Sequence, residues 1–536
     1  MNIIRKIFCL LPTILFLSYL HGQDNTFRDT IPLSEDDTIV NGFSTPRDSY
    51  NKSENFFGEL RRKAYKSKWS KELHNIVIHP PKDPIQDTIN TARSELKYIQ
   101  YKGLTIGEIT FIKLNPFGTS ILDTSYRKDT WPNRTANALH VKTNDQFLKR
   151  HLLFHEGQKI DPNIVSDNER ILRDLSNIED VRIIIAPREN YPEVADIYIV
   201  IKDLWSKAFY LELKDVQSGK LELWDKNIFG TGNEFQTNIH WDPGKSDFWG
   251  FEAFYKRKNI FGSFINSEIF YKNVFETNSY GISIEKEFLT PTTKYAGGLD
   301  MYKLKTIDKL WYTDTSFTPE SIHINYYDVW LGRSFLLNKD KTNGRRRNNL
   351  VISTRYYNMF YLNNPETSKK YLHEYHNRKM WIGNIGFASR AFYRSNLVYS
   401  YGRTEDIPTG WMINLRYGKE FSEFCQRDYT GITFKKGNYV HNFGYLNSTY
   451  EYGTFLQGID DLQQGVSSLR INYFTNLFIV GSYKLRHFVR LNYVKGINRF
   501  EPERININDK NGIRGLIENS IYGEKKLAIN LESVAF

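Results

Sequence analysis

The sequence has 536 residues, of which 72 are Lys or Arg and 61 are Asp or Glu, so its net charge is +11. The chain is long enough for more than one domain, and its charge is spread along it without a nucleic-acid-binding motif, so we expect no nucleic-acid partner. A mean hydropathy of −0.53 and the lack of apolar runs of membrane-helix length after the first residues exclude a helical membrane protein.

Residues 1–22 have the pattern of a secretory signal peptide. A basic start precedes the apolar stretch Ile7–Leu20, and the small residue Gly22 provides a cleavage point. This stretch is too short to span a bilayer as a helix, with an uncleaved anchor as the alternative. Cys9 lies inside the stretch, so removal of the signal leaves Cys425 alone. The exported fold must therefore be stable without an internal disulfide.

Residues 23–96 are polar and mixed in composition, and the first part is typical of a flexible tether. Residues 54–78 predict one amphipathic helix, whose apolar side carries Phe57, Leu60, Ala64 and Trp69. Three prolines between positions 80 and 84 end that helix. We predict a periplasmic lead-in in which little chemistry is visible.

Residues 97–206 show a different pattern, in which strand and helix periods alternate. The expected order is one strand, two helices and two strands. These elements are predicted over residues 103–114, 144–154, 163–178, 180–188 and 194–206. The last strand alternates Ile197, Ile199 and Ile201 with Tyr198, Val200 and Lys202. The pattern predicts a small α+β domain.

No motif in the sequence indicates an enzyme. His151 and His155 are four residues apart on a predicted helix, a spacing that can hold a metal, but there is no HExxH motif and no third ligand nearby. We therefore expect core or surface histidines and no metal or other cofactor. The sequence also lacks a G-x-S-x-G nucleophile elbow, a Walker A loop and a cysteine cluster.

From residue 207 onward the chain shows long stretches in which apolar and polar residues alternate. Examples are residues 209–214, 234–241, 411–418 and 526–533. Such strands also occur in soluble sandwiches and propellers. Strands long enough to cross a bilayer, alternating tight turns and long polar loops, and 15% aromatic residues favour an antiparallel transmembrane β-barrel over residues 207–536. The absence of a blade-length repeat counts against a propeller.

A tetrapeptide near the C-terminus, Gly512-Ile513-Arg514-Gly515, lies in a long polar loop over about residues 496–524. Glycines on both sides let the backbone turn tightly, and an arginine inside a barrel needs a carboxylate partner to offset its desolvation. On the tetrapeptide alone, an ordinary solvent-exposed loop residue is the alternative. Its position after the small domain and the barrel pattern favours the functional interpretation.

These features together resemble the BamA/TamA-like family, in which a periplasmic POTRA domain precedes a surface-antigen-type β-barrel. The stretches that match a POTRA domain are "ITFIKLNPFG", "FLKRHLLFHEGQKID", "ERILRDLSNIEDVRI" and "VADIYIVIKDLWS". The tetrapeptide is similar to the family's (V/I)-R-G-(F/Y) signature, and Lys226–Gly232 to its N-x-x-G-x-G stretch. Leu516 departs from the signature, which usually has an aromatic residue there. The resemblance covers about residues 97–536.

The resemblance implies an outer-membrane protein of a Gram-negative bacterium that inserts proteins into the outer membrane or translocates them across it. The POTRA domain is expected in the periplasm, where it binds unfolded clients by strand addition. Periplasmic or lipoprotein partners and outer-membrane lipids are further expected partners. In the family, the signature loop folds into the barrel and its arginine pairs with an acidic residue of the inner wall. The resemblance implies the same for Arg514, but the family strand that carries the acidic residue comes after the point where this sequence stops.

Three alternatives stay open at this point. A two-partner secretion channel uses the same parts to export one dedicated substrate, although such proteins usually carry two POTRA domains. A structural or pore-forming barrel is the second alternative. A soluble all-β binding protein is the third.

The C-terminal residue, Phe536, is of the type that commonly ends the last strand of an outer-membrane barrel. Family members, however, usually continue for several strands after the signature loop. Either Phe536 ends an unusual barrel or the sequence is truncated. Because the strand from Lys526 to Phe536 directly follows that loop, we expect truncation, so that the barrel lacks its last strands in this sequence.

Overall fold

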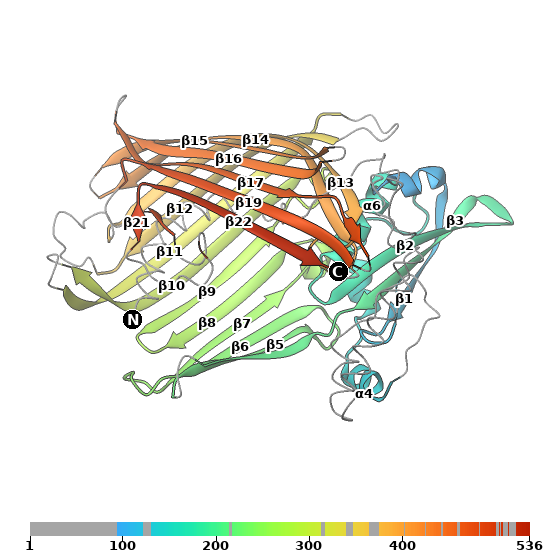
Figure 1. Ribbon diagram of the computed structural model, residues 1–536, viewed down its shortest axis with the longest axis horizontal. Helices are drawn as coiled ribbons and strands as arrows, with labels where there is room; N and C mark the ends of the chain where they lie inside the picture. The colour runs from blue at the N-terminus through green and yellow to red at the C-terminus, as the bar shows by residue number, and fades with distance from the viewer. Residues whose placement is uncertain are drawn as a thin grey trace.

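The computed structural model describes residues 94–536, except residues 120, 122–129, 214–216, 312–316, 339–346, 364–374, 401–402, 424, 441–442, 458–460, 482, 500–502, 504, 508–512 and 514–520. The predicted signal peptide and nearly all of the lead-in lie outside the described residues. The described chain forms a small N-terminal domain at one end of a large antiparallel sheet that curves into a barrel-shaped wall (Figure 1).

The N-terminal domain combines a three-stranded sheet with short helices. Its elements are η2 (Leu96–Tyr101), β1 (Thr105–Leu114), α4 (Trp131–Leu139), α5 (Asp145–Arg150), α6 (Pro162–Arg173), β2 (Ile178–Arg188) and β3 (Tyr191–Asp203). The sheet order is β1-β3-β2, with β3 parallel to β1 and antiparallel to β2. The five predicted elements are present, and α4 is an additional helix that the sequence pattern did not predict.

Local sequence explains where two of these helices begin. Asn144 caps α5 by accepting a hydrogen bond from the backbone N–H of Gln146 at 2.8 Å, and Asp161 caps α6 by accepting one from the N–H of Asn163 at 2.9 Å. Pro162 occupies the first position of α6, where a missing N–H costs no hydrogen bond. Polar caps therefore fix both helix starts.

The core of this domain lies between the sheet and α5 and α6. Leu148, Leu172 and Ile199 are among its fully buried members. Val200 is also fully buried, on the opposite side of β3, where it packs with Leu114 and Ile121. Because β3 is the central strand and both of its faces are covered, its C-terminal half is largely buried on both sides.

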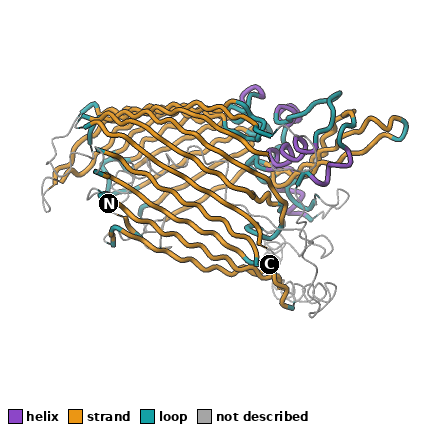
Figure 2. The backbone as a smooth tube through the Cα atoms, turned by 90° about the horizontal axis from the view of Figure 1, so that it is seen from above, coloured by secondary structure: helices purple, strands orange, loops and turns teal. Residues whose placement is uncertain are grey.

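The wall is built from antiparallel strands paired in sequence order. They are β4 (Lys207–Leu213), β5 (Gly219–Ile228), β6 (Asn233–Trp241), β7 (Trp249–Arg257), β8 (Asn266–Val274), β9 (Thr277–Lys286), β10 (Tyr295–Trp311), β11 (Phe317–Leu336), β12 (Arg347–Tyr361), β13 (Arg378–Ser395), β14 (Glu405–Ser422), β15 (Gln426–Val440), β16 (Gly444–Leu456), β17 (Leu462–Phe474), β18 (Phe478–Val480), β19 (Tyr483–Ile497) and β22 (Lys525–Ala535). Figure 2 shows these strands running side by side, tilted along the wall.

Side chains of each strand alternate between the interior and the exterior of the wall. On β14, Leu415 and Tyr417 are 51% and 62% exposed, whereas Asn414 and Arg416 between them are 7% and 6% exposed. This alternation follows from the two-residue period of a strand. On β14, apolar side chains therefore point outward and polar ones inward, as the sequence pattern predicts, whereas β11 to β13 also bury apolar residues such as Ile324 and Met359 on the inward face.

The first and last strands of the wall meet at a seam. The strand order returns on itself, with β22 next to β4. Among the described residues, paired registers join consecutive strands from β4 to β17, and join β17 to β19 and β19 to β22, but none joins β22 to β4. The two strands at this seam expose outward apolar residues such as Phe209 and Leu531.

The loop between β19 and β22 contains a short two-stranded sheet. Its strands are β20 (Ile505–Asn506) and β21 (Tyr522–Gly523). The backbone N–H of Gly496 donates to the carbonyl oxygen of Glu524 at 2.7 Å and closes the base of the loop. None of the helices in the described part of the chain is long and apolar enough to cross a membrane.

Candidate functional site at the junction of the N-terminal domain and the barrel

The N-terminal domain meets the barrel at two well-defined contacts, which together form the junction. The first is the turn between β5 and β6, residues 226–232. The backbone N–H of Asn144 donates to the carbonyl oxygen of Gly230 at 2.8 Å, and the Asn227 side chain donates to the carbonyl oxygen of Val141 at 3.1 Å. The turn is therefore hydrogen-bonded to the segment that links α4 to α5.

Two glycines let this turn approach the domain closely. Gly230 and Gly232 have φ angles of +74° and +66°, a region that residues with a Cβ rarely adopt. A Cβ on Gly230 would lie 2.4 Å from the carbonyl oxygen of Lys142, and one on Gly232 would lie 2.2 Å from the ring of Phe147. The N-x-x-G-x-G stretch identified in the sequence thus forms the first contact.

A buried polar network supports this contact from inside the domain. The Asp203 carboxylate accepts hydrogen bonds from the backbone N–H and the hydroxyl of Thr143, each at 2.9 Å, and contacts His140 Nε2 at 2.9 Å. The side chains of Asn177 and Asn227 donate to the Thr143 hydroxyl at 3.0 and 3.3 Å. The end of β3 and the barrel turn are therefore held by one set of hydrogen bonds.

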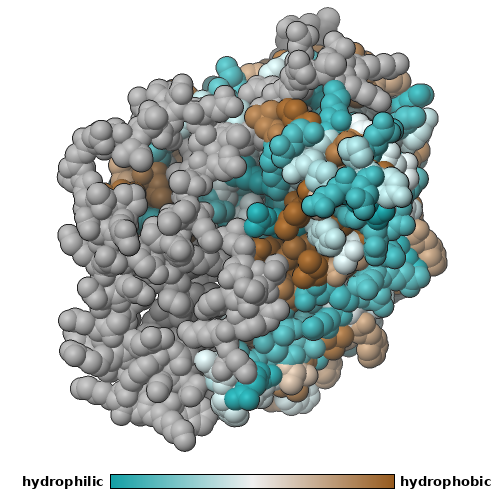
Figure 3. Space-filling view, turned by 90° about the vertical axis from the view of Figure 1, so that its right-hand side faces the viewer, coloured by the Kyte–Doolittle hydropathy of each residue, from teal (hydrophilic) through white to brown (hydrophobic). Residues whose placement is uncertain are grey.

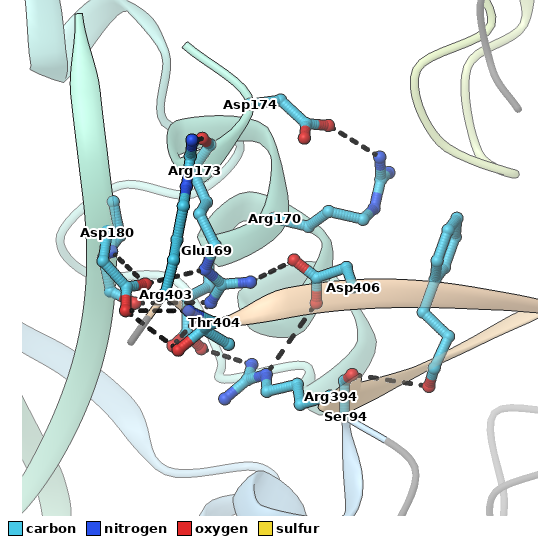
Figure 4. Close-up of polar contacts among 12 residues, drawn as sticks. Ser94, Glu169, Arg170, Arg173, Asp174, Asp180, Arg394, Arg403, Thr404 and Asp406 are labelled. Carbon is cyan, nitrogen blue, oxygen red and sulfur yellow. Dashed lines mark hydrogen bonds and ion pairs between the residues drawn. The ribbon is translucent and has the colours of Figure 1, made fainter. Parts of the chain in front are cut away.

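The second contact is ionic and joins α6 to the hairpin of β13 and β14 (Figure 4). Glu169 and Arg173 of α6 are one helical turn apart and pair with each other at 3.2 Å. Arg173 also pairs with Asp406 of β14, and Glu169 pairs with Arg394 of β13. Opposite charges thus alternate across the boundary between the domain and the wall.

Arg173 is the centre of this cluster. Its guanidinium is 3% exposed and contacts the carboxylates of Glu169, Asp180 and Asp406. Burial alone would lower the pKa of Arg173, but the three negative charges outweigh burial and raise it above its ordinary value. Arg173 is therefore charged at every pH of interest, and its charge is compensated by groups from both sides of the junction.

The Glu169 carboxylate pairs with the neighbouring positive charges. Its carboxylate is 1% exposed, accepts from the Tyr98 hydroxyl, and pairs with the Lys97 amine at 3.1 Å. Burial raises the pKa of Glu169, but Arg394, Lys97 and Arg173 outweigh this effect and lower the pKa to about 2. Burial lowers the pKa of Lys97 to about 8. The carboxylate is thus ionised at neutral pH.

The connection between β13 and β14 is itself held in one conformation. The Glu405 carboxylate accepts hydrogen bonds from the backbone N–H groups of Val398, Tyr399 and Ser400, the shortest at 2.7 Å. Arg403 in the same connection donates to the carbonyl oxygen of Arg173 at 3.3 Å. A barrel turn that is ordered by Glu405 therefore presents Arg403 to the N-terminal domain.

Further polar contacts extend the junction around the rim. Arg347 of β12 makes a bidentate pair with Asp167 of α6, at 2.7 and 3.0 Å. Lys258 and Glu234 pair at 2.7 Å, and the Ser176 hydroxyl donates to Glu234 at 2.6 Å. The domain is therefore fixed to strands on both sides of the barrel rather than to one hairpin alone.

The inner wall of the barrel carries ion pairs at several depths. Arg355 of β12 pairs with Asp328 of β11, and Arg470 of β17 pairs with Glu451 of β16 at 2.8 Å. These side chains share the inward face, because each is directly opposite or diagonal to another inward residue in the strand register. These parts of the interior are therefore polar and ion-paired.

Most of the predicted signature loop lies outside the residues that the structure describes. Gly512, Arg514 and Gly515 lie outside the described residues, and the acidic partner expected for Arg514 stays a prediction. Ile513 is 55% exposed, and its backbone N–H donates to the carbonyl oxygen of Ile507 at 3.1 Å. Phe536 directly follows β22 and exchanges two backbone hydrogen bonds with Lys484, at 2.8 and 3.1 Å.

The two histidines considered in the sequence have separate environments. His151 is 3% exposed, and its Nδ1 contacts the Phe147 carbonyl oxygen at 2.8 Å. His155 is exposed and contacts the Glu156 carbonyl oxygen and Gln158. No cluster of His, Cys, Asp and Glu in the described ranges could hold a metal ion.

The sequence pattern does not predict the ionic contact between α6 and the hairpin of β13 and β14. Glu169 and Arg173 belong to the predicted helix over residues 163–178, where charged residues normally face solvent. Arg394 and Asp406 belong to strands whose inward positions are also expected to be polar. The one available signal is the density of charge in "NERILRD", which does not say which barrel residues it meets.

No protein-family model and no curated protein matches the sequence. Solved structures that match the chain include BamA from Haemophilus ducreyi lacking POTRA domains 1–3. It is 12% identical, with 74% of this chain and 72% of that chain covered and a TM-score of 0.29.

Two further solved structures are CdiB proteins. CdiB from Acinetobacter baumannii is 11% identical, with 93% of this chain and 100% of that chain covered and a TM-score of 0.33. CdiB from Escherichia coli is 9% identical, with 92% and 94% covered and a TM-score of 0.39. Over most of its length, the chain is therefore similar to two kinds of solved structure, BamA and CdiB.

Proposed function

We propose that this chain is an outer-membrane β-barrel of the BamA/TamA-like type, which inserts proteins into the bacterial outer membrane or translocates them across it. In this proposal residues 97–206 form a periplasmic POTRA domain, and residues 207–536 form the membrane-embedded barrel. The chain has no catalytic role and needs no cofactor. Its clients are unfolded outer-membrane or secreted proteins.

The distribution of side chains on the wall carries the membrane part of the proposal. Large apolar residues are exposed on the outward faces of strands around the wall, among them Ile269 (54%), Leu331 (65%), Leu415 (51%) and Ile529 (56%). A soluble protein rarely exposes an apolar surface of this extent, whereas a membrane barrel needs one to contact lipid.

The seam between β22 and β4 supports the insertion part of the proposal. A strand edge without a full ladder presents free backbone N–H and C=O groups, which a client strand can pair with. The N-terminal sheet offers two more edges, because its order is β1-β3-β2. Its junction with the barrel places these edges at the same end as the barrel opening (Figure 1).

The proposal is tested by reconstitution of the purified full chain into proteoliposomes. An unfolded outer-membrane barrel client is added, and its folding is followed by the shift in mobility that folded barrels show on unheated gels. We expect faster client folding than in empty liposomes or in liposomes that carry a porin-type barrel. Equal rates in all three preparations would contradict the proposal.

Site-specific photocrosslinking locates the client during this assay. A photoreactive residue at Ile184 on β2 or Tyr210 on β4 is expected to crosslink to the client, because both side chains are exposed on edge strands. The matched control is Leu331 on β11, which faces outward and lies on a fully paired strand. Equal crosslinking at all three positions would indicate non-specific contact.

A two-partner secretion channel is the second candidate, and the ion-paired inner wall favours it. Pairs such as Asp328 with Arg355 keep the interior polar and able to admit an extended polypeptide. The two candidates differ in client range. Acceleration of several unrelated barrel clients supports insertion, whereas transport of a single exported polypeptide without any effect on barrel folding supports the secretion channel.

A further inference from the structure

Helix α4 exposes its two largest apolar side chains and directs the polar side chain of Asn137 toward the domain. Trp131 and Leu139 are 68% and 64% exposed, whereas Pro132 is buried. On the inner side, the Asn137 side chain accepts from the backbone N–H of Phe117 at 3.2 Å and donates to its carbonyl oxygen at 3.0 Å. A helix at the surface of a soluble domain normally has the opposite arrangement.

The spacing of the exposed residues makes this a continuous stripe. Five residues are exposed at positions i, i+3, i+4, i+7 and i+8 of the helix, namely Trp131, Arg134, Thr135, Ala138 and Leu139. Residues with this spacing share one face of an α-helix. The apolar ends of the stripe therefore point the same way, with a basic residue between them.

Two barrel turns beside α4 and α5 expose phenylalanines. Phe229 in the turn between β5 and β6 is 87% exposed, and Phe261 in η3 (Ile260–Gly262), between β7 and β8, is 79% exposed. The first turn contacts Val141, just after α4. In the second, the Asn259 side chain donates to the carbonyl oxygen of Arg150 at 2.8 Å. The exposed aromatic residues thus border the helices.

Basic side chains flank these apolar residues. Lys142, Lys149 and Arg150 are exposed on the segment that follows α4. The Arg257 guanidinium lies 5.1 Å from the centre of the Phe261 ring. Aromatic residues with adjacent Lys and Arg are the side chains that stabilise protein at the lipid head-group region, where the rings enter the acyl boundary and the cations meet phosphates.

Exposed apolar residues also occur on the two strands that the first turn connects. Leu223 on β5 and Phe235 on β6 are 39% and 41% exposed and lie on the strands that the first turn connects. Figure 1 shows α4 at the lower edge of the domain end of the molecule. Figure 3 views that end and shows hydrophobic patches set among hydrophilic residues.

We propose that this surface is a lipid-docking surface, defined as Trp131 and Leu139 of α4 with Phe229 and Phe261 of the turns. It rests on the near leaflet of the bilayer that surrounds the barrel, and the flanking lysines and arginines bind lipid phosphates. Docking holds the N-terminal domain against the membrane as well as against the rim. The inference rests on the proposed function, because it requires the wall to span a bilayer.

The test places an environment-sensitive fluorophore on single cysteines in the full chain with Cys9→Ser and Cys425→Ser, reconstituted in phosphatidylethanolamine and phosphatidylglycerol vesicles. Leu139→Cys reports on the docking surface. Tyr191→Cys, which is 64% exposed at the far hairpin of the same domain, is the matched water-exposed control. Leu415→Cys reports on the outward face of the wall. Nitroxide lipids and aqueous iodide are the two quenchers.

We expect the label at position 139 to be quenched several-fold more by nitroxide lipids than by iodide, with the reverse at position 191. Strong iodide quenching at 139 overturns the inference, and protection of 139 from both quenchers assigns the surface to a protein contact and also overturns it. If nitroxide lipids do not quench the label at position 415, the result contradicts the proposed function and therefore also the inference. Lipid quenching at 415 without quenching at 139 rejects the docking surface alone.

Discussion

Arg173 of α6 and Asp406 of β14 form a buried ion pair across the boundary between the N-terminal domain and the barrel wall, with side chains that are 3% and 8% exposed. The two residues are 233 positions apart in the sequence. Removal of one partner of such a pair leaves the other charge buried without compensation. The orientation of the domain relative to the barrel therefore depends on this pair.

Replacement of Arg173 is expected to loosen the domain. Arg173→Met removes the charge that compensates Glu169, Asp180 and Asp406, and the expected cost is about 3–5 kcal/mol. Hydrogen exchange in α6 of the reconstituted full chain measures the effect. The matched control is Arg188→Met, because the side chains of Arg188 and Asp196 are 42% and 18% exposed, so water screens their pair and its loss is expected to have a much smaller effect. Equal effects of the two substitutions would contradict the role of Arg173.

Glycine at position 232 is expected to be essential for close docking of the barrel turn. Gly232→Ala places a Cβ against the Phe147 ring, and we expect it to cost about 1–3 kcal/mol more than Gly157→Ala. Gly157 has a similar positive φ of +82° but no atom within 4 Å of the added Cβ, so it isolates backbone strain from the collision. Protease cleavage between residues 203 and 207 reports loss of docking. Identical cleavage rates in the two variants would show that the collision is relieved without cost.

Acid is expected to weaken the N-terminal domain in two steps. Burial lowers the pKa of His151 to about 4 in the folded state, below its ordinary value of 6.5. The unfolded chain therefore binds more protons between these values, and the stability contributed at neutral pH is lost as the pH falls from 6.5 to 4. The folded pKa of Glu169, about 2, adds a second loss below its ordinary value of 4.5.

A non-titrating variant separates these steps. In His151→Gln, the loss of stability between pH 6.5 and 4 should shrink by up to about 3 kcal/mol, while the loss below pH 4.5 remains. Denaturant unfolding of the domain, followed at several pH values, measures both. An unchanged pH profile in the variant would assign the first step to another group.

Two neighbouring positions on β22 test which side of the wall meets lipid. Ile529 is 56% exposed on the outward face, and Asn530 points inward opposite Arg490. Ile529→Glu is expected to destabilise the inserted barrel by about 1–3 kcal/mol, because a carboxylate is costly against lipid. Asn530→Glu, next to the positive Arg490, is expected to change stability little. Urea unfolding in vesicles compares them, and the reverse order of effects would place the apolar face toward water.

Sequence patterns were sufficient for features that depend on local periodicity. The outward set Trp411, Leu415 and Tyr417 could be predicted because successive side chains of a strand point to opposite faces. The elements of the N-terminal domain could be predicted because strands and helices each have their own period of apolar residues. Gly230 and Gly232 could be predicted from the N-x-x-G-x-G motif. Helix α4 was missed, because its apolar residues Trp131 and Leu139 are not the ones that face the core.

By itself, then, the sequence determined the alternation of the wall and the order of elements in the small domain, since both arise from short-range patterns of polar and apolar residues. Only the tertiary structure decided that Glu169 and Arg173 meet Arg394 and Asp406. Those contacts depend on the registers of many successive strand pairs. They also depend on the packing of the turn between β5 and β6 against the Phe147 ring. Charge alone could not select these partners, because any inward arginine or aspartate of the wall satisfies the same local pattern.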